Sequence, residues 1–155
     1  MSEQDPDAIA RAIIGSNLYM ALGTADPEGQ PWVSPVYYTA DGYADYYWVS
    51  SPEATHSRNI ALRPEVSMVI FDSRATIGEG QAVYMSALAE ELTDADLGRG
   101  IDIFSRVSQT HGARAWVPAD VRSPALHRLY RATATEHSVL DPARAGVDRR
   151  IPVTP

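Results

Sequence analysis

The chain has 155 residues, of which 45% are hydrophobic and 21% charged, and carries a formal net charge of -7 with a pI near 4.9. This length and composition fit one globular domain with its own core, and the acidic balance disfavours nucleic acid and anionic membrane surfaces as partners. The absence of cysteine excludes disulfides, a thiolate nucleophile, iron–sulfur clusters and cysteine-ligated zinc.

The first residues predict a short amphipathic helix. Asp5 can cap a helix that has Pro6 at its first position, and Ile9, Ile13 and Ile14 then form an apolar face that ends at glycine 15. The segment lacks the basic and apolar runs of an export signal, and no later stretch reaches the roughly 18 apolar residues of a membrane span. We therefore expect a cytoplasmic protein.

The middle of the chain predicts short strands in a meander, interrupted by one helix. The strand segments are rich in aromatic and β-branched residues and are bounded by turn residues. They are residues 18–25, 31–39 and 43–50, then 66–73 and 80–92. Between the third and fourth strands, residues 51–64 predict a helix with Ser51 as N-cap and Pro52 at its first position.

The last third predicts one long helix and one long strand. Apolar residues at helical spacing indicate a helix over residues 93–112, followed by an irregular connection over 113–124 and a strand over 125–140. Because closure removes exposed strand edges, we expect a mainly β (α+β) fold, a six-or-so-stranded antiparallel split β-barrel with flanking helices. One domain would span residues 1–141, with a mobile C-terminal tail over 142–155.

The junction WVSSPEATHSRN is the best phosphate candidate in the chain. A helix N-terminus presents unpaired N–H groups and a partial positive charge. Around it stand side-chain donors suited to a phosphate monoester, namely Ser50, Ser51, Thr55, His56 and Arg58. The alternative is that Ser51 only caps the helix while the other side chains face solvent.

Two further features suit a planar cofactor. In WVSPVYY, Pro35 interrupts a strand and frees backbone groups that could face a flat ring, although an edge strand protected by proline explains it equally well. The neighbouring tyrosines and Trp48 could frame that ring or belong to the core or to a dimer contact. Gln81 follows a glycine-rich loop and can both donate to and accept from a polyol chain.

Other kinds of site find no support in the sequence. The four histidines lack the spacing of a metal-binding motif, so we expect no metal. A nucleophile elbow of the GxSxG type is absent, and no paired carboxylates stand out.

The succession of LGTADPEGQPWVSPVYY, YYWVSSPEATHSRNIALRPEVSMVIFD and GEGQAVYMSALAEEL resembles the flavin mononucleotide (FMN)-binding split barrels related to pyridoxamine 5'-phosphate oxidase. The resemblance covers residues 18–92 and the closing strand near 129–140. It implies that the first piece lines the isoalloxazine ring, the second binds the ribityl chain and phosphate, and the third supplies a glutamine. The corresponding residues are Trp32, Val33, Ser34, Pro35 and Val36, then Val49, Ser50, Ser51, Thr55, His56, Arg58 and Asn59, and finally Gln81.

The resemblance further implies a homodimer with two flavin sites and hydride transfer to or from a small-molecule substrate. The chain departs from the oxidases themselves, because relatives usually carry lysine or arginine at the position of His56 and the basic C-terminal substrate segment has no match. We therefore expect an FMN-dependent oxidoreductase that does not oxidise vitamin B6. The alternatives are a deazaflavin-dependent reductase on the same barrel, a non-enzymatic flavin or haem carrier, and a ligand-binding barrel without a redox role.

Overall fold

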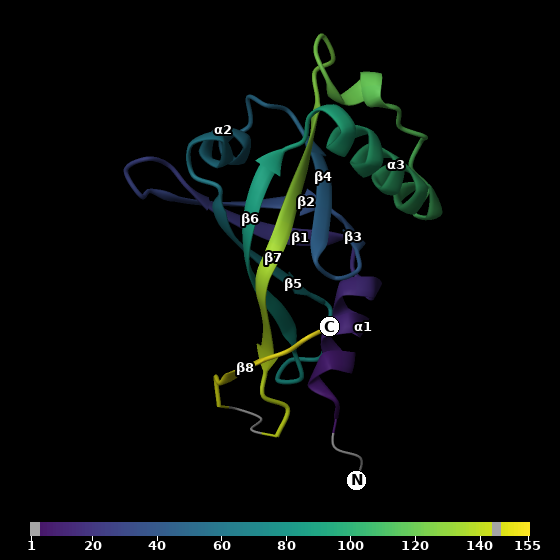
Figure 1. The fold of residues 1–155 in the computed structure, drawn as a ribbon. Coiled ribbons are helices and arrows are strands. Elements are labelled where there is room, and N and C mark those ends of the chain that lie inside the picture. Colours follow the sequence, from purple (N-terminus) through teal and green to yellow (C-terminus); the bar gives the residue numbers. More distant parts are fainter. Residues whose placement is uncertain (1–3, 144–146) are drawn as a thin grey trace.

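The computed structural model describes residues 4–143 and 147–155, and this part of the chain forms three α-helices and eight β-strands (Figure 1). A short 3-10 helix, Pro118–Val121, precedes β7. In chain order the elements are α1 (Pro6–Ser16), β1 (Tyr19–Ala25), β2 (Pro31–Tyr37), β3 (Thr39–Asp41), β4 (Asp45–Ser50), α2 (Thr55–Leu62), β5 (Glu65–Phe71), β6 (Ala82–Glu91), α3 (Asp94–Thr110), β7 (Arg128–Leu140) and β8 (Arg150–Pro152).

The strands form one antiparallel sheet in the order β2-β1-β5-β6-β7-β4-β3, with β8 paired to the end of β7. Each of the predicted strand segments lies in this sheet, and β3 and β8 are additional short strands. The sheet curls into an open barrel, so the predicted α+β split barrel is confirmed. Curling brings β2 and β4 close together, although they are far apart in the order of pairing.

The core follows the two-residue alternation of the strands. Met20 and Leu22 of β1 and Met68 of β5 point into the barrel and are almost fully buried. Trp48 of β4 stacks there on Tyr130 of β7, with ring centroids 5.7 Å apart. A second, smaller cluster lies under α3, where the apolar positions predicted from helical spacing are buried against β4 and β7.

The helix ends show where local sequence determines the fold. Asp5 caps α1 by accepting a hydrogen bond from the Asp7 amide at 3.0 Å, as predicted. The prediction that Ser51 caps α2 is wrong, because α2 begins at Thr55. The Ser51 hydroxyl instead accepts from the Glu53 amide at 3.1 Å and forms a turn one step before the helix.

The end of the chain also differs from the prediction of a mobile tail. Residues 144–146 lie outside the described part, but Arg150–Pro152 pairs with β7 as β8. Val153 is buried and its amide donates to the His137 carbonyl at 3.0 Å. The amide of Thr154 donates to Asp7 in α1 at 2.8 Å. These contacts hold the C-terminal segment against the barrel.

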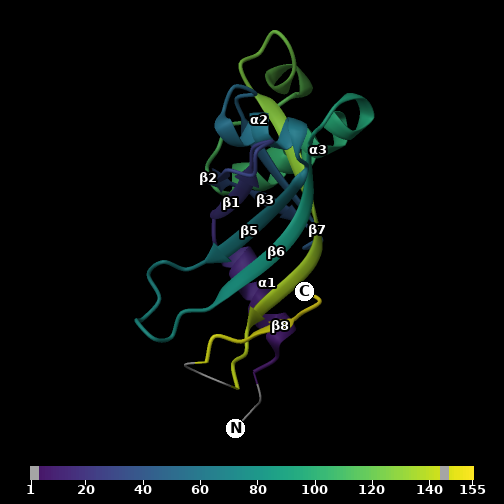
Figure 2. The same cartoon turned by 90° about the vertical axis from the view of Figure 1, so that its left-hand side faces the viewer.

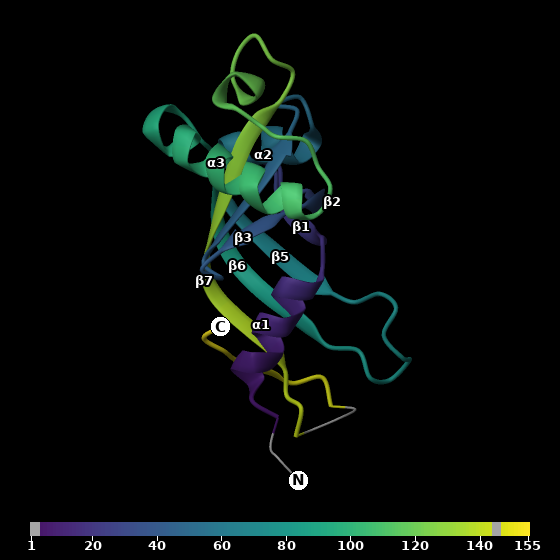
Figure 3. The ribbon, with the colours of Figure 1, turned by 90° about the vertical axis from the view of Figure 1, so that its right-hand side faces the viewer.

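The two faces of the long strands are covered differently. Figure 3 shows α1 and α3 in front of the sheet, whereas no helix lies in front of β5 and β6 in the opposite view of Figure 2. We call this uncovered side the outer face. It carries exposed apolar side chains, including Val33, Phe71 and Leu88, which are 66%, 48% and 51% exposed. No helix in the described residues is long and apolar enough to cross a membrane.

Candidate functional site

His56 joins the two sides of the opening in the barrel. Its Nδ1 lies 3.2 Å from the Ser34 hydroxyl of β2, and its Nε2 lies 2.9 Å from the Ser50 hydroxyl of β4. The indole of Trp32 donates to the Ser34 hydroxyl at 2.8 Å and extends the network. We call Trp32, Ser34, Ser50 and His56 the junction cluster. The structure thus brings together residues from the first two candidate segments.

The junction cluster always has a hydroxyl hydrogen to offer. If Nδ1 of neutral His56 accepts from Ser34, then Nε2 donates to Ser50 and the Ser50 hydrogen remains free. With the other tautomer, Ser50 donates to the ring and the Ser34 hydrogen remains free. Protonation makes both ring nitrogens donors and frees both hydroxyl hydrogens. The cluster therefore suits an acceptor, and an anion most of all when the imidazole is charged.

His56 is buried, at 9% exposed, and desolvation lowers its pKa from the ordinary 6.5. The ring is consequently neutral at neutral pH in the free protein. A bound anion would reverse this effect, because opposite charge favours the imidazolium form.

The first turn of α2 faces the same region of the molecule. The N-cap residue Ala54 offers no side-chain acceptor to the helix. The backbone amide of Arg58 donates to the Ala54 carbonyl at 3.0 Å. Thr55 at the first position is exposed. Asn59, one turn later, is buried and donates to the Thr24 hydroxyl at 3.0 Å, which ties α2 to β1. Asn59 therefore has a structural contact that fixes the position of the helix.

The predicted ring-lining residues lie on two faces of β2. Trp32, Ser34 and Val36 alternate with Val33 and Pro35, and the latter two are exposed. Val36 is buried in the barrel core. Val49 packs against the cluster under α3. Of the five predicted residues in β2, Trp32 and Ser34 thus belong to the junction cluster.

Two predicted residues lie away from the junction cluster. Arg58 of α2 is exposed and pairs at 2.5 Å with Glu53, which precedes the helix. Gln81 precedes β6, at the end of the sheet near α1, whereas α2 lies at the opposite end (Figure 1). Its amide donates to the Leu140 carbonyl and accepts from the Leu140 amide, both at 2.8 Å. Gln81 therefore links β6 to β7.

Sequence reasoning missed two features of the site region. Tyr37 of β2 and His111 at the end of α3 form a hydrogen bond of 2.6 Å between the Tyr37 hydroxyl and Nδ1. The second is a hollow of about 310 Å³ in the outer face, lined by residues that include Gly23, Ser67 and Val33. Contacts between segments far apart in the sequence create both features, so no local motif marks them.

Comparison with known proteins supports one family for this fold. The family model described as pyridoxamine 5'-phosphate oxidase matches residues 7–140. No curated protein matches the chain in sequence.

Solved structures share the fold at low identity. A haem-binding protein from Mycobacterium smegmatis is 20% identical with a TM-score of 0.72. The alignment covers 99% of this chain and 60% of that protein, so this chain spans less than two thirds of its length. An F420 reductase is 19% identical with a TM-score of 0.61, and the alignment covers 83% of this chain and 95% of the reductase. HutZ, the haem storage protein from Vibrio cholerae, is 15% identical with a TM-score of 0.69, and coverage is 89% and 95%.

Proposed function

Because the chain belongs to the pyridoxamine 5'-phosphate oxidase family, we propose that it is an FMN-dependent oxidoreductase that transfers a hydride to or from a small molecule. The observation that carries the proposal is the bridge of His56 between Ser34 and Ser50 at the opening of the barrel. It joins the strand proposed to face the ring to the helix proposed to bind the phosphate.

The junction cluster and α2 fit the phosphate and ribityl chain of FMN. A phosphate is an acceptor-only group at neutral pH, and the free hydroxyl hydrogen of Ser34 or Ser50 and the uncapped first turn of α2 supply donors. Ser51 precedes that turn and Thr55 is its first residue, and both would complete the proposed phosphate contacts. Arg58 would join them only after release from Glu53.

The isoalloxazine ring would lie along β2. Trp32 is half exposed and its indole N–H is fixed by Ser34, so the flat face of the side chain is held in place. Val33 and Pro35 point to the other face of β2, so in this proposal they contact the ring through their backbone, while Val36 and Val49 support the strands from within. These contacts would orient the ring and exclude water from one side of it.

FMN supplies hydride chemistry at its N5 atom, and the protein supplies position and electrostatics. The proposal requires no side chain to act as an acid or base. His56 is the protein group that can hold a proton near the bound anion, since its pKa responds to that charge.

We also propose a homodimer formed through the outer face. The support is the uncovered apolar surface around Val33, Phe71 and Leu88, on a sheet face without a helix in front of it (Figure 2). Within one protomer Gln81 is far from α2, so its proposed contact with flavin would be made to the site of a second copy. A cytoplasmic location remains part of this proposal.

Two alternatives use the same barrel. The F420 reductase neighbour favours a deazaflavin, and the haem-binding neighbours favour a carrier without turnover. At the junction cluster, both ring nitrogens of His56 are in hydrogen bonds, so a haem iron would have to displace a serine. This favours a flavin over haem at this position.

Titration with FMN and with riboflavin, which lacks the phosphate, tests the site. We expect Ser50→Ala to weaken FMN binding and leave riboflavin binding nearly unchanged, with Ser73→Ala, at an exposed serine between β5 and β6, as a matched control. Equal binding of FMN by wild type and Ser50→Ala would contradict the proposed phosphate site. Reduction of bound flavin by a nicotinamide donor, followed by steady turnover of an acceptor, would distinguish the enzyme from a carrier.

A further inference from the structure

The hollow in the outer face arises from a row of short side chains. Antiparallel pairing aligns Gly23 of β1, Ser67 of β5 and Ser86 of β6 side by side, and Glu136 of β7 ends the row. A methyl group at Gly23 would lie 3.5–3.6 Å from atoms of Ser67 and would occupy part of the hollow. Because glycine lacks this group, the hollow is deeper at this position. Val33 lies at one end, in the strand proposed to face the flavin ring.

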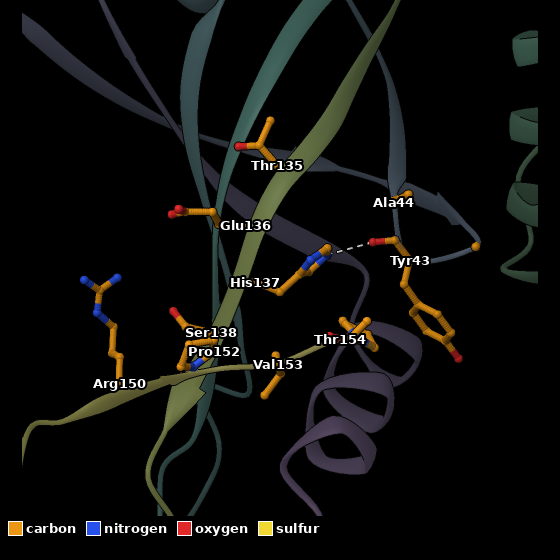
Figure 4. Close-up of a pocket in the computed structure, with 12 residues that line it drawn as sticks. Tyr43, Ala44, Thr135, Glu136, His137, Ser138, Arg150, Pro152, Val153 and Thr154 are labelled. Carbon is orange, nitrogen blue, oxygen red and sulfur yellow. Dashed lines mark hydrogen bonds between the residues drawn. The ribbon is translucent and has the colours of Figure 1, made fainter.

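A second cavity continues the hollow past β7. Its volume is about 670 Å³, and it extends to the turn at Tyr43 and to β8. The two cavities share Glu136, Ser138 and Arg150 in their linings, so they meet at these three residues. Figure 4 shows Arg150, Glu136 and Ser138 on one side of β7, while His137 points to the other side toward Tyr43.

Arg150 is the arginine that lines both cavities. Its guanidinium carbon lies 5.4 Å from the ring centre of Tyr84, a distance suited to cation–π contact. Within residues 4–143 and 147–155 it has no ion pair, including none with Glu136. Arg150 belongs to β8, beyond the residues 7–140 that the family model matches. The segment that follows the matched residues therefore places the guanidinium of Arg150 in the lining of both cavities.

We propose that Arg150 binds the anionic group of a small-molecule carboxylate whose body lies in the hollow between Arg150 and Val33. The guanidinium offers two parallel donors to a carboxylate, and the hydroxyls of Ser67, Ser86 and Ser138 line the same space. The carboxylate of Glu136 lines the same space and repels a bound anion, which lowers the affinity of the site for that anion. The identification of this carboxylate as the substrate rests on the proposed flavin function. Its binding beside Arg150 is independent of that function.

A second copy on the outer face would enclose this site. Gly23 has no side chain and those of Ser67 and Ser86 are too short to fill the hollow, so a partner packed on the larger side chains of Val33, Phe71 and Leu88 would cover it. Enclosure would exclude water and strengthen the contact of Arg150 with an anion.

Benzoate and its uncharged analogue benzamide provide the test, with binding to the full chain measured by ligand-detected NMR. We expect Arg150→Gln to weaken benzoate binding about tenfold, since a charge-assisted contact is lost. Arg149→Gln removes the same charge from the neighbouring residue, which lines neither cavity, and should bind benzoate like wild type. Glu136→Gln should bind it more tightly, and benzamide should bind weakly to every variant.

Equal loss in Arg149→Gln and Arg150→Gln, unchanged binding in Arg150→Gln, or no preference for benzoate over benzamide in wild type would overturn the proposal. FMN titration of the same variants separates this result from the proposed function. Arg150→Gln should bind FMN normally, so failure of FMN binding with intact benzoate binding would remove the flavin assignment and leave the anion site.

Discussion

Replacement of His56 by alanine should weaken FMN binding. The ring holds Ser34 and Ser50 at 3.2 and 2.9 Å, and one hydrogen bond contributes about 0.5–1.5 kcal/mol net. Loss of both would remove about 1–3 kcal/mol of the interactions that position the two hydroxyls. At 1.4 kcal/mol for each factor of ten, the Kd for FMN at neutral pH should rise roughly 5- to 150-fold. Quenching of flavin fluorescence measures this Kd.

The same substitution should remove a pH dependence of binding. Burial lowers the pKa of His56 in the free protein, whereas a phosphate beside the ring raises it in the complex. Between these two pKa values the complex holds a proton that the free protein lacks, so affinity for FMN rises as pH falls. Riboflavin has no phosphate, and its affinity should stay flat over about pH 6.5 to 8.5.

His137→Gln is the matched control for both measurements. Burial also lowers the pKa of His137, but its Nε2 donates to the Tyr43 carbonyl at 2.8 Å, away from the junction cluster. This variant should bind FMN with the affinity and pH profile of wild type. A His56→Ala protein with wild-type affinity and the wild-type pH slope would refute the phosphate assignment.

Asn59→Ala should lower the free energy of unfolding by about 1–3 kcal/mol in chemical denaturation, because a buried hydrogen bond to β1 is lost; an unchanged midpoint would argue against that tie. Leu88→Asp on the outer face should leave Tm nearly unchanged and raise the dimer dissociation constant at least about tenfold in sedimentation, whereas a persisting dimer would place the interface elsewhere. Burial lowers the pKa of His56 and His137 in the folded protein, so Tm should fall as pH drops from about 6.5 toward their folded pKa values. His137→Gln should make this fall less steep, and an equally steep fall would exclude His137 as a cause. Arg58→Gln should weaken FMN binding less than His56→Ala in the same titration, because Arg58 already pairs with Glu53, and an equal loss would mean that the pair opens.

The strands could be predicted from sequence because their evidence is local. Aromatic and β-branched runs between turn residues mark β1, β2 and β4 to β7, and the helical spacing of Leu97, Ile101 and Phe104 marks α3. The start of α2 was wrong because a serine that can cap a helix can equally close a turn, as Ser51 does. β8 was missed because three residues become a strand only through their pairing with β7.

The candidate site was predictable residue by residue, but its arrangement was not. Ser34, Ser50 and His56 each stood out by donor chemistry, whereas their contact depends on the curl that brings β2 beside β4. Pairing between distant strands also creates the hollow beside Gly23 and places the cationic side chain of Arg150 in its lining. Sequence separation hides these neighbours, because strand register acts between segments far apart in the chain.

An absorption spectrum of the purified protein, recorded during titration with FMN and in parallel with deazaflavin, tests the central claim most directly. The account predicts a shifted FMN spectrum that saturates at one flavin per protomer and is lost at the same concentrations in His56→Ala. Binding of deazaflavin alone would contradict the FMN assignment in favour of the reductase alternative, and binding of neither would contradict a flavin function for this barrel.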